Sequence, residues 1–524
     1  MRNTIIFISM AMLAACVPAS RDVPQYTIEQ FLDNLSIGGG SFSADESRLL
    51  VTSNQTGIYN VFALIVDGSG EEQLTYSEGD YRAAISYFPE DDRFLFASDQ
   101  GGNEIRHISQ HEGDATYYSS DFSLDDRVLY ILTNEGSEYT YLSSYNLGTG
   151  EKEVVYETGW DLMYANYSFN HTYQVIGINE DAKTVVKMIE VASGKEVDMP
   201  DFEGGDISGV SISRSEQKIR LSVGSSTSPG NIYVYTLEDR NLQQLTNTLN
   251  PEINEADLVA GEVIRYTSFD GLEIPAILYK PQQASKKNKV PVLLWIHGGP
   301  GGQSRLGFDS FLQYIVNHGY AVLAVNNRGS SGYGKTFYNL DNQRHGEDDL
   351  MDCVKAKDFL AGLDYVDTAK IGILGGSYGG YMVMAALAFQ PEEFAVGVNL
   401  FGVTNWMRTL KSIPSWWESQ RKALYTEMGD PYSADSTRLY RISPLFHAEN
   451  VTNPLIVLQG ANDPRVLQVE SDEIVAAVKQ NGVPVEYVIF DDEGHGFVKK
   501  ENEIVGYGKI LEFLDQYLKG NGTS

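Results

Sequence analysis

The sequence predicts two successive domains: an all-β domain followed by an α/β domain with a mostly parallel sheet. Three observations indicate this: short alternating strands up to about residue 257, a phrase that repeats along them, and strands that alternate with helical stretches from Glu262 onward. With 524 residues, the chain is long enough for each domain to bury a sizeable core.

The repeated phrase consists of an apolar residue, then Ser, Pro or Asn, and in most copies acidic residues. It starts at Phe42, Phe88, Phe122, Phe169 and Ile212, at intervals of 46, 34, 47 and 43 residues. A four-stranded propeller blade has a period of about 40–45 residues. We therefore expect residues 22–257 to form a β-propeller of five or six blades, with a hairpin turn at each phrase. The regular period argues against a β-sandwich.

The second domain is expected over residues 258–524. An Asp270-Gly271 turn joins its first two predicted strands, six further strands follow, and helical patterns lie between them at 348–361, 381–389 and 471–480. Eight strands with an antiparallel entry hairpin and helical crossovers are typical of an α/β-hydrolase.

One pentapeptide in this domain has the pattern of a catalytic turn. Gly375-Gly376-Ser377-Tyr378-Gly379 matches G-x-S-x-G, with a predicted strand before it and a predicted helix after it. That context defines a nucleophile elbow, in which small residues permit a tight turn that exposes the serine hydroxyl. Ser377 is therefore the candidate nucleophile.

A serine hydroxyl needs an imidazole to accept its proton and a carboxylate to hold that imidazole in the right tautomer. Asp463 follows the predicted strand that ends at Leu458, and His495 follows the one that ends at Phe490. Their order after Ser377 and their position at strand ends are those of α/β-hydrolases. Either residue alone could be an ordinary loop residue, but the three together predict a catalytic triad.

Acyl transfer also requires N–H donors for the developing oxyanion. We expect one donor to be the amide of Tyr378, directly after the candidate nucleophile. The other should come from the loop His297-Gly298-Gly299-Pro300, which follows the predicted strand at 290–296.

The chain from about Val263 to its end resembles the prolyl oligopeptidase family of serine peptidases, especially its acylaminoacyl-peptidase-like branch. The matching segments are HGGP at 297–300, NRGSSGYG at 327–334, GGSYGG at 375–380, QGANDPRV at 459–466 and GHGF at 494–497. The repeated phrases likewise resemble turns of TolB-like and prolyl-oligopeptidase-type propellers. The resemblance implies that the Gly299 and Tyr378 amides form the oxyanion hole. It also implies that Arg465 binds a substrate carbonyl, although Arg465 could instead pair with a carboxylate.

The same resemblance implies hydrolysis of short peptides through an acyl-enzyme on Ser377, with the propeller admitting only small or unfolded chains. Dipeptidyl, acylaminoacyl and endopeptidase modes all stay open, because no acidic pair for a free N-terminus can be singled out among 71 Asp and Glu residues. A carboxylesterase with the same triad and a binding lipoprotein with a vestigial hydrolase are the alternatives. The sequence does not predict the oligomeric state.

Charge and composition exclude several other partners. A net charge of −32 argues against a nucleic acid. No cofactor and no metal are expected, because two cysteines cannot build a Cys-rich zinc site and His107 and His111 lie in a strand-rich region. Residues 329–336 match the P-loop pattern, but weak helix formers follow them, so nucleotide binding is not expected.

The first residues have the pattern of an export signal. Arg2 precedes a mostly apolar run at 4–15, which is too short to span a bilayer. Leu13-Ala14-Ala15-Cys16 resembles a bacterial lipoprotein box, with an ordinary signal peptide as the alternative. We expect residues 1–21 to be a signal and short tether, Cys16 to be lipidated, and the protein to be periplasmic and anchored to the outer membrane.

Overall fold

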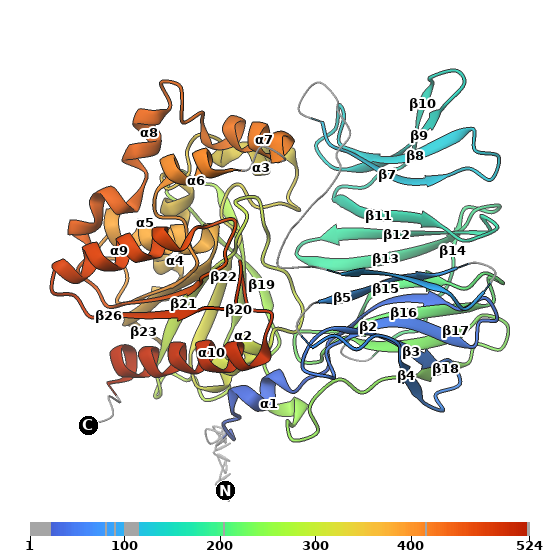
Figure 1. Ribbon diagram of the computed structural model, residues 1–524, viewed down its shortest axis with the longest axis horizontal. Coiled ribbons are helices and arrows are strands. Elements are labelled where there is room, and N and C mark those ends of the chain that lie inside the picture. The colour runs from blue at the N-terminus through green and yellow to red at the C-terminus, as the bar shows by residue number, and fades with distance from the viewer. Residues whose placement is uncertain are drawn as a thin grey trace, which may run out of the picture.

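The computed structural model describes residues 23–78, 81–88, 91–98, 115–202, 205–413 and 417–520. A propeller and a helix-covered sheet lie side by side (Figure 1), which confirms the predicted fold class. Cys16, His107 and His111 lie outside the described residues. None of the described helices has the length and apolar character needed to cross a membrane.

Five antiparallel sheets form the propeller within the described residues, in agreement with the prediction of five or six blades. Their strands are β1 (Ile37–Phe42), β2 (Arg48–Ser53), β3 (Asn60–Ile65) and β4 (Glu71–Gln73); β5 (Arg82–Tyr87) and β6 (Phe94–Ser98); β7 (Tyr117–Phe122), β8 (Val128–Thr133), β9 (Tyr141–Asn146) and β10 (Lys152–Tyr156); β11 (Asp161–Tyr167), β12 (Tyr173–Glu180), β13 (Lys183–Glu190) and β14 (Lys195–Glu196); and β15 (Asp206–Ile212), β16 (Lys218–Gly224), β17 (Asn231–Thr236) and β18 (Leu242–Gln244).

The repeated phrase makes the same turn in four of these sheets. Its serine is Ser43, Ser123 or Ser213; in the fourth copy it is Ser168, so that turn begins at Tyr167, two residues before the Phe169 that the sequence analysis named. In each copy the serine carbonyl accepts a hydrogen bond from the amide three residues on. The serine Oγ accepts from the amide five residues on. The third residue after the serine always has a positive φ, between 55° and 60°. A recurring hydrogen-bonded turn thus explains the repeat that the sequence displays.

The eight strands predicted for the second domain form a single sheet, and their order in it is β19-β20-β22-β21-β23-β24-β25-β26. The strands are β19 (Glu262–Thr267), β20 (Glu273–Tyr279), β21 (Val290–Ile296), β22 (Ala321–Val325), β23 (Val366–Gly376), β24 (Gly397–Leu400), β25 (Leu455–Gly460) and β26 (Val485–Phe490). β20 pairs antiparallel with β19 and β22, and the other pairings are parallel.

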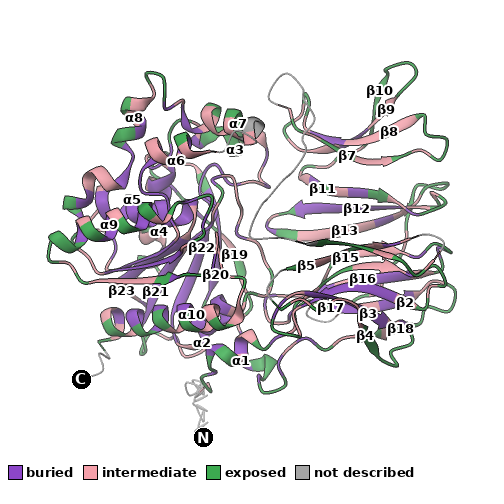
Figure 2. Cartoon of the chain, viewed as in Figure 1, coloured by how far each residue is buried: buried purple, intermediate pink, exposed green. Residues whose placement is uncertain are grey.

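Helices cover both faces of this sheet. They are α2 (Ser310–Asn317), α3 (Lys335–Tyr338), α4 (Asp348–Ala361), α5 (Tyr378–Phe389), α6 (Trp406–Ser412), α7 (Glu418–Met428), α8 (Ser436–Arg441), α9 (Gln468–Gln480) and α10 (Lys500–Leu514). Successive residues of β21 alternate between two buried clusters: Val292 and Leu294 pack with α4, α5 and α9, whereas Leu293 packs with α2 and α10. The central strands are accordingly buried in Figure 2, while the outer helix faces are exposed.

The first helix, α1 (Ile28–Leu32), packs on the second domain, although the sequence analysis assigned residue 22 onward to the propeller. Phe31 is fully buried and contacts the ring of Tyr314 on α2, with centroids 6.0 Å apart. Ser310 Oγ donates a hydrogen bond to the Phe31 carbonyl at 2.9 Å. The two ends of the described chain consequently lie on the same domain (Figure 1).

The P-loop-like segment lies at the contact between the domains. Contrary to the sequence analysis, it does open into a helix, but α3 has only four residues. Lys335 Nζ donates to the carbonyl of Asn134 in the propeller at 2.9 Å. The amide and the Oγ1 of Thr336 donate to the two oxygens of Glu138, at 2.7 and 2.8 Å. The lysine and threonine of the motif therefore bind the propeller.

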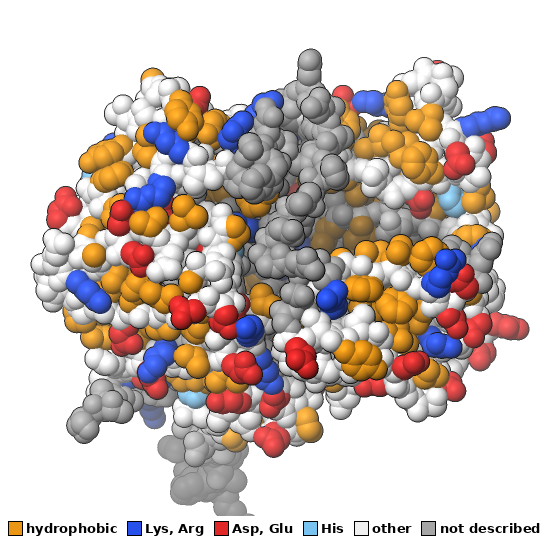
Figure 3. Space-filling model, in the orientation of Figure 1, with side chains coloured by type: hydrophobic (Ala, Val, Ile, Leu, Met, Phe, Trp, Pro, Cys, Tyr) orange, Lys and Arg blue, Asp and Glu red, His pale blue; other side chains and the backbone are white. Residues whose placement is uncertain are grey.

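Acidic side chains are spread over both domains on the face shown in Figure 3, with lysine and arginine side chains among them. The excess of negative charge is thus distributed over a solvated surface on this face, which favours solubility.

Candidate active site

Ser377 lies at the turn between β23 and α5, with φ of 57° and ψ of −117°. Few non-glycine residues adopt this backbone conformation, and it is found where the surroundings enforce it. A Cβ on Gly379 would lie 2.1 Å from the Ile296 carbonyl oxygen, and one on Gly375 would lie 2.6 Å from the Gly379 carbonyl carbon. The turn therefore requires glycine at both positions, as expected of a nucleophile elbow.

The structure brings together the three residues of the predicted triad. His495 Nε2 lies 2.9 Å from Ser377 Oγ, and His495 Nδ1 lies 2.7 Å from Asp463 Oδ2. The three side chains come from loops after β23, β25 and β26, at one edge of the sheet. This chain of contacts can pass a proton from the hydroxyl to the imidazole while the carboxylate stabilises the resulting imidazolium.

Asp463 is fixed by backbone groups of its own loop. It is buried, and its Oδ1 accepts hydrogen bonds from the amides of Arg465 at 2.8 Å and Val466 at 2.9 Å. These two donors leave Oδ2 directed at His495. The side chain of Arg465 is exposed on this loop, at the same edge of the sheet as the elbow.

A residue that the sequence analysis did not single out holds the loop of His495. Glu493 is only 2% exposed, and its carboxylate accepts hydrogen bonds from the amides of Val498 and Lys499 at 3.0 and 2.9 Å. Asn502 Nδ2 donates to it as well, at 2.8 Å. Because these hydrogen bonds join Glu493 to residues 498 and 499, they close the loop that contains His495 and restrict where its imidazole can lie.

The predicted oxyanion donors lie on segments next to Ser377. A Cβ built on Gly298 would be 3.4 Å from Ser377 Cβ and 4.0 Å from its Oγ, so the glycine loop passes close to the hydroxyl. His297 anchors this loop, with Nε2 2.7 Å from Ser330 Oγ, and burial lowers its pKa. The amide of Tyr378 belongs to the first turn of α5, where N–H groups have no carbonyl partner within the helix.

The side chain of Tyr378 points away from the elbow into the interior, where its hydroxyl donates a hydrogen bond to Asp349. Burial, together with the charge of Asp341, raises the pKa of Asp349 to about 6, despite the opposing charge of His345. The His345 ring packs edge-on against Tyr378, with centroids 5.6 Å apart. Buried polar groups thus support the helix end that carries the candidate oxyanion donor.

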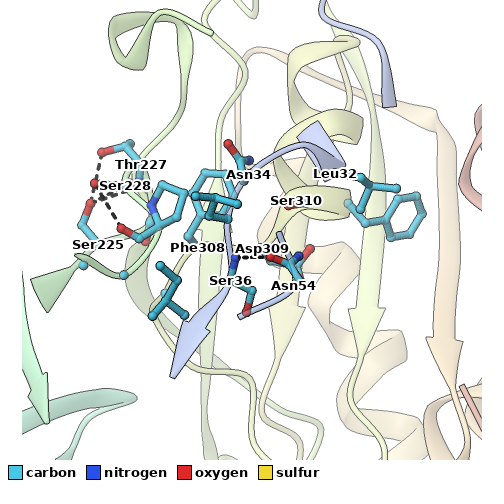
Figure 4. Close-up of a pocket in the computed structure, with 18 of the residues that line it drawn as sticks. Leu32, Asn34, Ser36, Asn54, Ser225, Thr227, Ser228, Phe308, Asp309 and Ser310 are labelled. Carbon is cyan, nitrogen blue, oxygen red and sulfur yellow. Dashed lines mark hydrogen bonds between the residues drawn. The ribbon is translucent and has the colours of Figure 1, made fainter. Parts of the chain in front are cut away.

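A cavity of about 990 Å³ lies between the domains (Figure 4). Asn54 and Ser228 line it from the propeller, and Phe308 and Asp309 line it from the second domain. The triad residues are not part of its lining, but Phe497, two residues after His495, is. Burial raises the pKa of Asp309, and burial with the charges of Glu493 and Asp309 raises that of Glu503, on another wall of this cavity, to about 7.

The fold and the hydrogen-bonded residues Ser377, His495 and Asp463 define the class of the protein. It is an α/β-hydrolase with an N-terminal propeller. Residues 306–521 match the family model described as prolyl oligopeptidase family, and residues 84–248 match the one described as prolyl oligopeptidase, N-terminal beta-propeller domain. The two matched ranges span well over half of the chain, and the chain belongs to the prolyl oligopeptidase family.

Three known proteins illustrate the similarity. Dipeptidyl peptidase family member 6 of Caenorhabditis elegans is 34% identical over 338 residues, which are 60% of this chain and 46% of that protein. Dipeptidyl aminopeptidase BIII of Pseudoxanthomonas mexicana is 38% identical over 299 residues, which are 55% of this chain and 43% of that protein. The crystal structure of a puromycin hydrolase aligns with a TM-score of 0.70 at 19% identity, over 92% of this chain and 70% of that chain.

The match to the two curated relatives therefore spans less than half of their length. The structural alignment, at its low identity, supports the two-domain fold alone.

Proposed function

We propose that this protein is a serine peptidase that hydrolyses short peptides. The observation that carries the proposal is the chain Ser377–His495–Asp463, with contacts of 2.9 and 2.7 Å, on an elbow beside a glycine loop. The names of the two dipeptidyl relatives support a peptide substrate.

The proposed reaction begins when His495 Nε2 removes the proton of Ser377 Oγ and the alkoxide attacks the carbonyl carbon of the peptide bond. The amides of Tyr378 and Gly299 would donate hydrogen bonds to the oxyanion. Protonated His495 then gives its proton to the leaving amine, and an acyl-enzyme remains on Ser377. Water, deprotonated by the same imidazole, releases the acid.

The arrangement of the domains supports short substrates. Arg265 forms a bidentate ion pair with Asp181 of the propeller, at 2.8 and 3.1 Å, and Glu138 of the propeller accepts two hydrogen bonds from Thr336. These contacts hold the propeller against the second domain, so a folded protein would be excluded while a short peptide could occupy the space between them. Arg465 would bind a substrate carbonyl beside the bond that is cleaved.

The first experiment compares two chromogenic peptide amides, one N-acylated and one with a free amine, with Ser377→Ala as the blank. Hydrolysis of either amide by the wild type alone supports the peptidase. Faster hydrolysis of the free amine indicates dipeptidyl action, and faster hydrolysis of the blocked peptide indicates acylaminoacyl or endopeptidase action. If only simple esters react, the protein is an esterase and the proposal is wrong.

We also propose that the protein lies in the periplasm of a bacterium and is anchored to the outer membrane by a lipid on Cys16, on the basis of the sequence at 1–16. Mass spectrometry of the N-terminal fragment of protein from membranes would find a diacylglyceryl group on this cysteine. Recovery of an unmodified Cys16, or of a chain cut after it, would contradict the anchor.

A further inference from the structure

Three side chains of metal-ligand type meet in the interior beside the elbow. Asp341 ends a turn of 3-10 helix (Asn339–Asp341), His345 follows it, and Glu427 lies near the end of α7. Their ligand atoms all lie within 4.8 Å of one another. The side chains of Asp341 and His345 are 1% and 0% exposed, and that of Glu427 is 18% exposed. We refer to these three residues as the DHE cluster.

The two most buried members of the DHE cluster lack hydrogen-bond partners. Among the described residues, neither oxygen of Asp341 and neither ring nitrogen of His345 makes a hydrogen bond. His345 Nε2 lies 3.2 Å from Asp341 Oδ2 and 3.7 Å from Glu427 Oε1, whereas charge-assisted N–H···O bonds measure about 2.7–2.9 Å. The buried carboxylate of Asp341 is therefore compensated only by a long ion pair with His345, which leaves room for a cation of higher charge.

The two separations that involve His345 fit a cation bound by these side chains. If a cation lies about 2.1 Å from each atom, as is usual for zinc, separations of 3.2 and 3.7 Å correspond to ligand angles of about 100° and about 120°. Such angles are close to those of a tetrahedral site. Glycine makes room for the carboxylate, since a Cβ on Gly329 would lie 1.9 Å from Asp341 Oδ2.

The charges around the DHE cluster favour an ion of charge two. Asp341, Glu427 and the nearby buried Asp349 bring three carboxyl groups to one imidazole. A proton on His345 supplies one positive charge, whereas a divalent ion supplies two and leaves the imidazole neutral and able to donate its lone pair. One imidazole with carboxylates is a donor set that suits zinc or manganese.

We propose that Asp341, His345 and Glu427 bind one divalent transition-metal ion, Zn²⁺ or Mn²⁺, that ties α7 to the segment behind Tyr378. The proposal departs from the sequence analysis, which expected no metal, and it is independent of the proposed peptidase activity. The amide of Gln343 already donates to the Glu427 carbonyl at 2.7 Å, so the ion would reinforce an existing contact between the end of α7 and residues 339–345.

The test uses the full chain purified without a histidine tag. Elemental analysis should find about one equivalent of zinc or manganese, and chelator-treated protein should show visible d–d absorption when one equivalent of Co²⁺ is added. Zn²⁺ or Mn²⁺ at a hundredfold excess over its Kd should raise the midpoint of thermal unfolding by about 5 °C. His345→Gln and Glu427→Gln should lose these responses, whereas His318→Gln, on the opposite face of the sheet, should keep them.

The wild-type titration alone can overturn the proposal, whether or not the variants fold. Chelator-treated wild type that gives neither Co²⁺ absorption nor a thermal shift has no such site. In that case an imidazolium signal from His345 in NMR would identify a proton as the cation. Metal binding that His345→Gln retains unchanged would place the ion elsewhere and would equally contradict the proposal.

Discussion

Replacement of Asp463 by asparagine should leave its loop in place and reverse the tautomer of His495. The oxygen of the new carboxamide has to occupy the Oδ1 position, because the amides of Arg465 and Val466 donate to that position at 2.8 and 2.9 Å. The NH₂ group then occupies the Oδ2 position, 2.7 Å from His495 Nδ1. Two N–H groups cannot face each other there, so Nδ1 becomes the acceptor and Nε2 carries the proton.

A protonated Nε2 cannot take the proton of Ser377, whose Oγ lies 2.9 Å away. The same tautomer reversal in a serine protease lowers kcat about 10⁴-fold, which corresponds to about 5 kcal/mol of transition-state stabilisation. We expect a loss of this size in kcat for Asp463→Asn, with KM little changed because the substituted group does not touch substrate.

The assay is steady-state hydrolysis of a chromogenic amide, accompanied by urea unfolding of each variant. Asp491→Asn, an exposed aspartate at the end of β26, is the matched control and should keep wild-type activity. If folded Asp463→Asn retained more than about a tenth of the wild-type kcat, the tautomer reasoning would be refuted.

Three further predictions follow from other parts of the structure. Gly379→Ala should lower the free energy of unfolding by about 2 kcal/mol or more and abolish activity, because the new Cβ would lie 2.1 Å from the Ile296 carbonyl oxygen. The control is Gly508→Ala, which has open space around the new Cβ and should not destabilise the protein. Equal stability of the two variants in urea unfolding would contradict this packing argument. Burial and nearby acids raise the pKa of Glu503 from 4.5 to about 7, so ionisation of this carboxyl group destabilises the folded state increasingly as the pH rises from 4.5 to 7. Glu503→Gln should therefore raise the free energy of unfolding by about 2 kcal/mol at pH 8 and very little near pH 4.5. An equal gain at both pH values would be inconsistent with ionisation as the cause. Glu138→Ala removes two hydrogen bonds between the domains and should raise the ratio of the hydrolysis rate of a long peptide to that of a dipeptide amide. The control variant is Glu153→Ala, on an exposed strand, which should leave this ratio unchanged. An unchanged ratio in Glu138→Ala would argue against size selection by the propeller.

The sequence predicted the fold class because its strongest signals are local. The hairpin phrase recurs in four of the five propeller sheets as a hydrogen-bonded turn around Ser43, Ser123, Ser168 and Ser213, and the apolar strands of the second domain alternate with helices. The elbow was also visible, because close backbone contacts restrict Gly375 and Gly379 to glycine.

What the sequence could not reveal depends on contacts between distant segments. α1 has only five residues, so nothing in its own pattern indicates that Phe31 packs on α2. Glu493 and Asp349 are buried carboxylates with specific partners, yet among 71 acidic residues their spacing does not distinguish them from surface acids. Glu427 approaches His345 only because α7 folds back over the loop after β22, which a linear pattern does not record.

The attachment of α1 to the second domain has a consequence for the order of folding during synthesis. Ile28 and Phe31 leave the ribosome among the first residues of the described chain, but their partners on α2 and α10 are made only after the whole propeller. The propeller is thus an insertion between two parts of one hydrophobic core. Until α2 has been synthesised, the apolar face of α1 has no place to pack, and the core that α1 shares with α10 is completed only at the very end of translation.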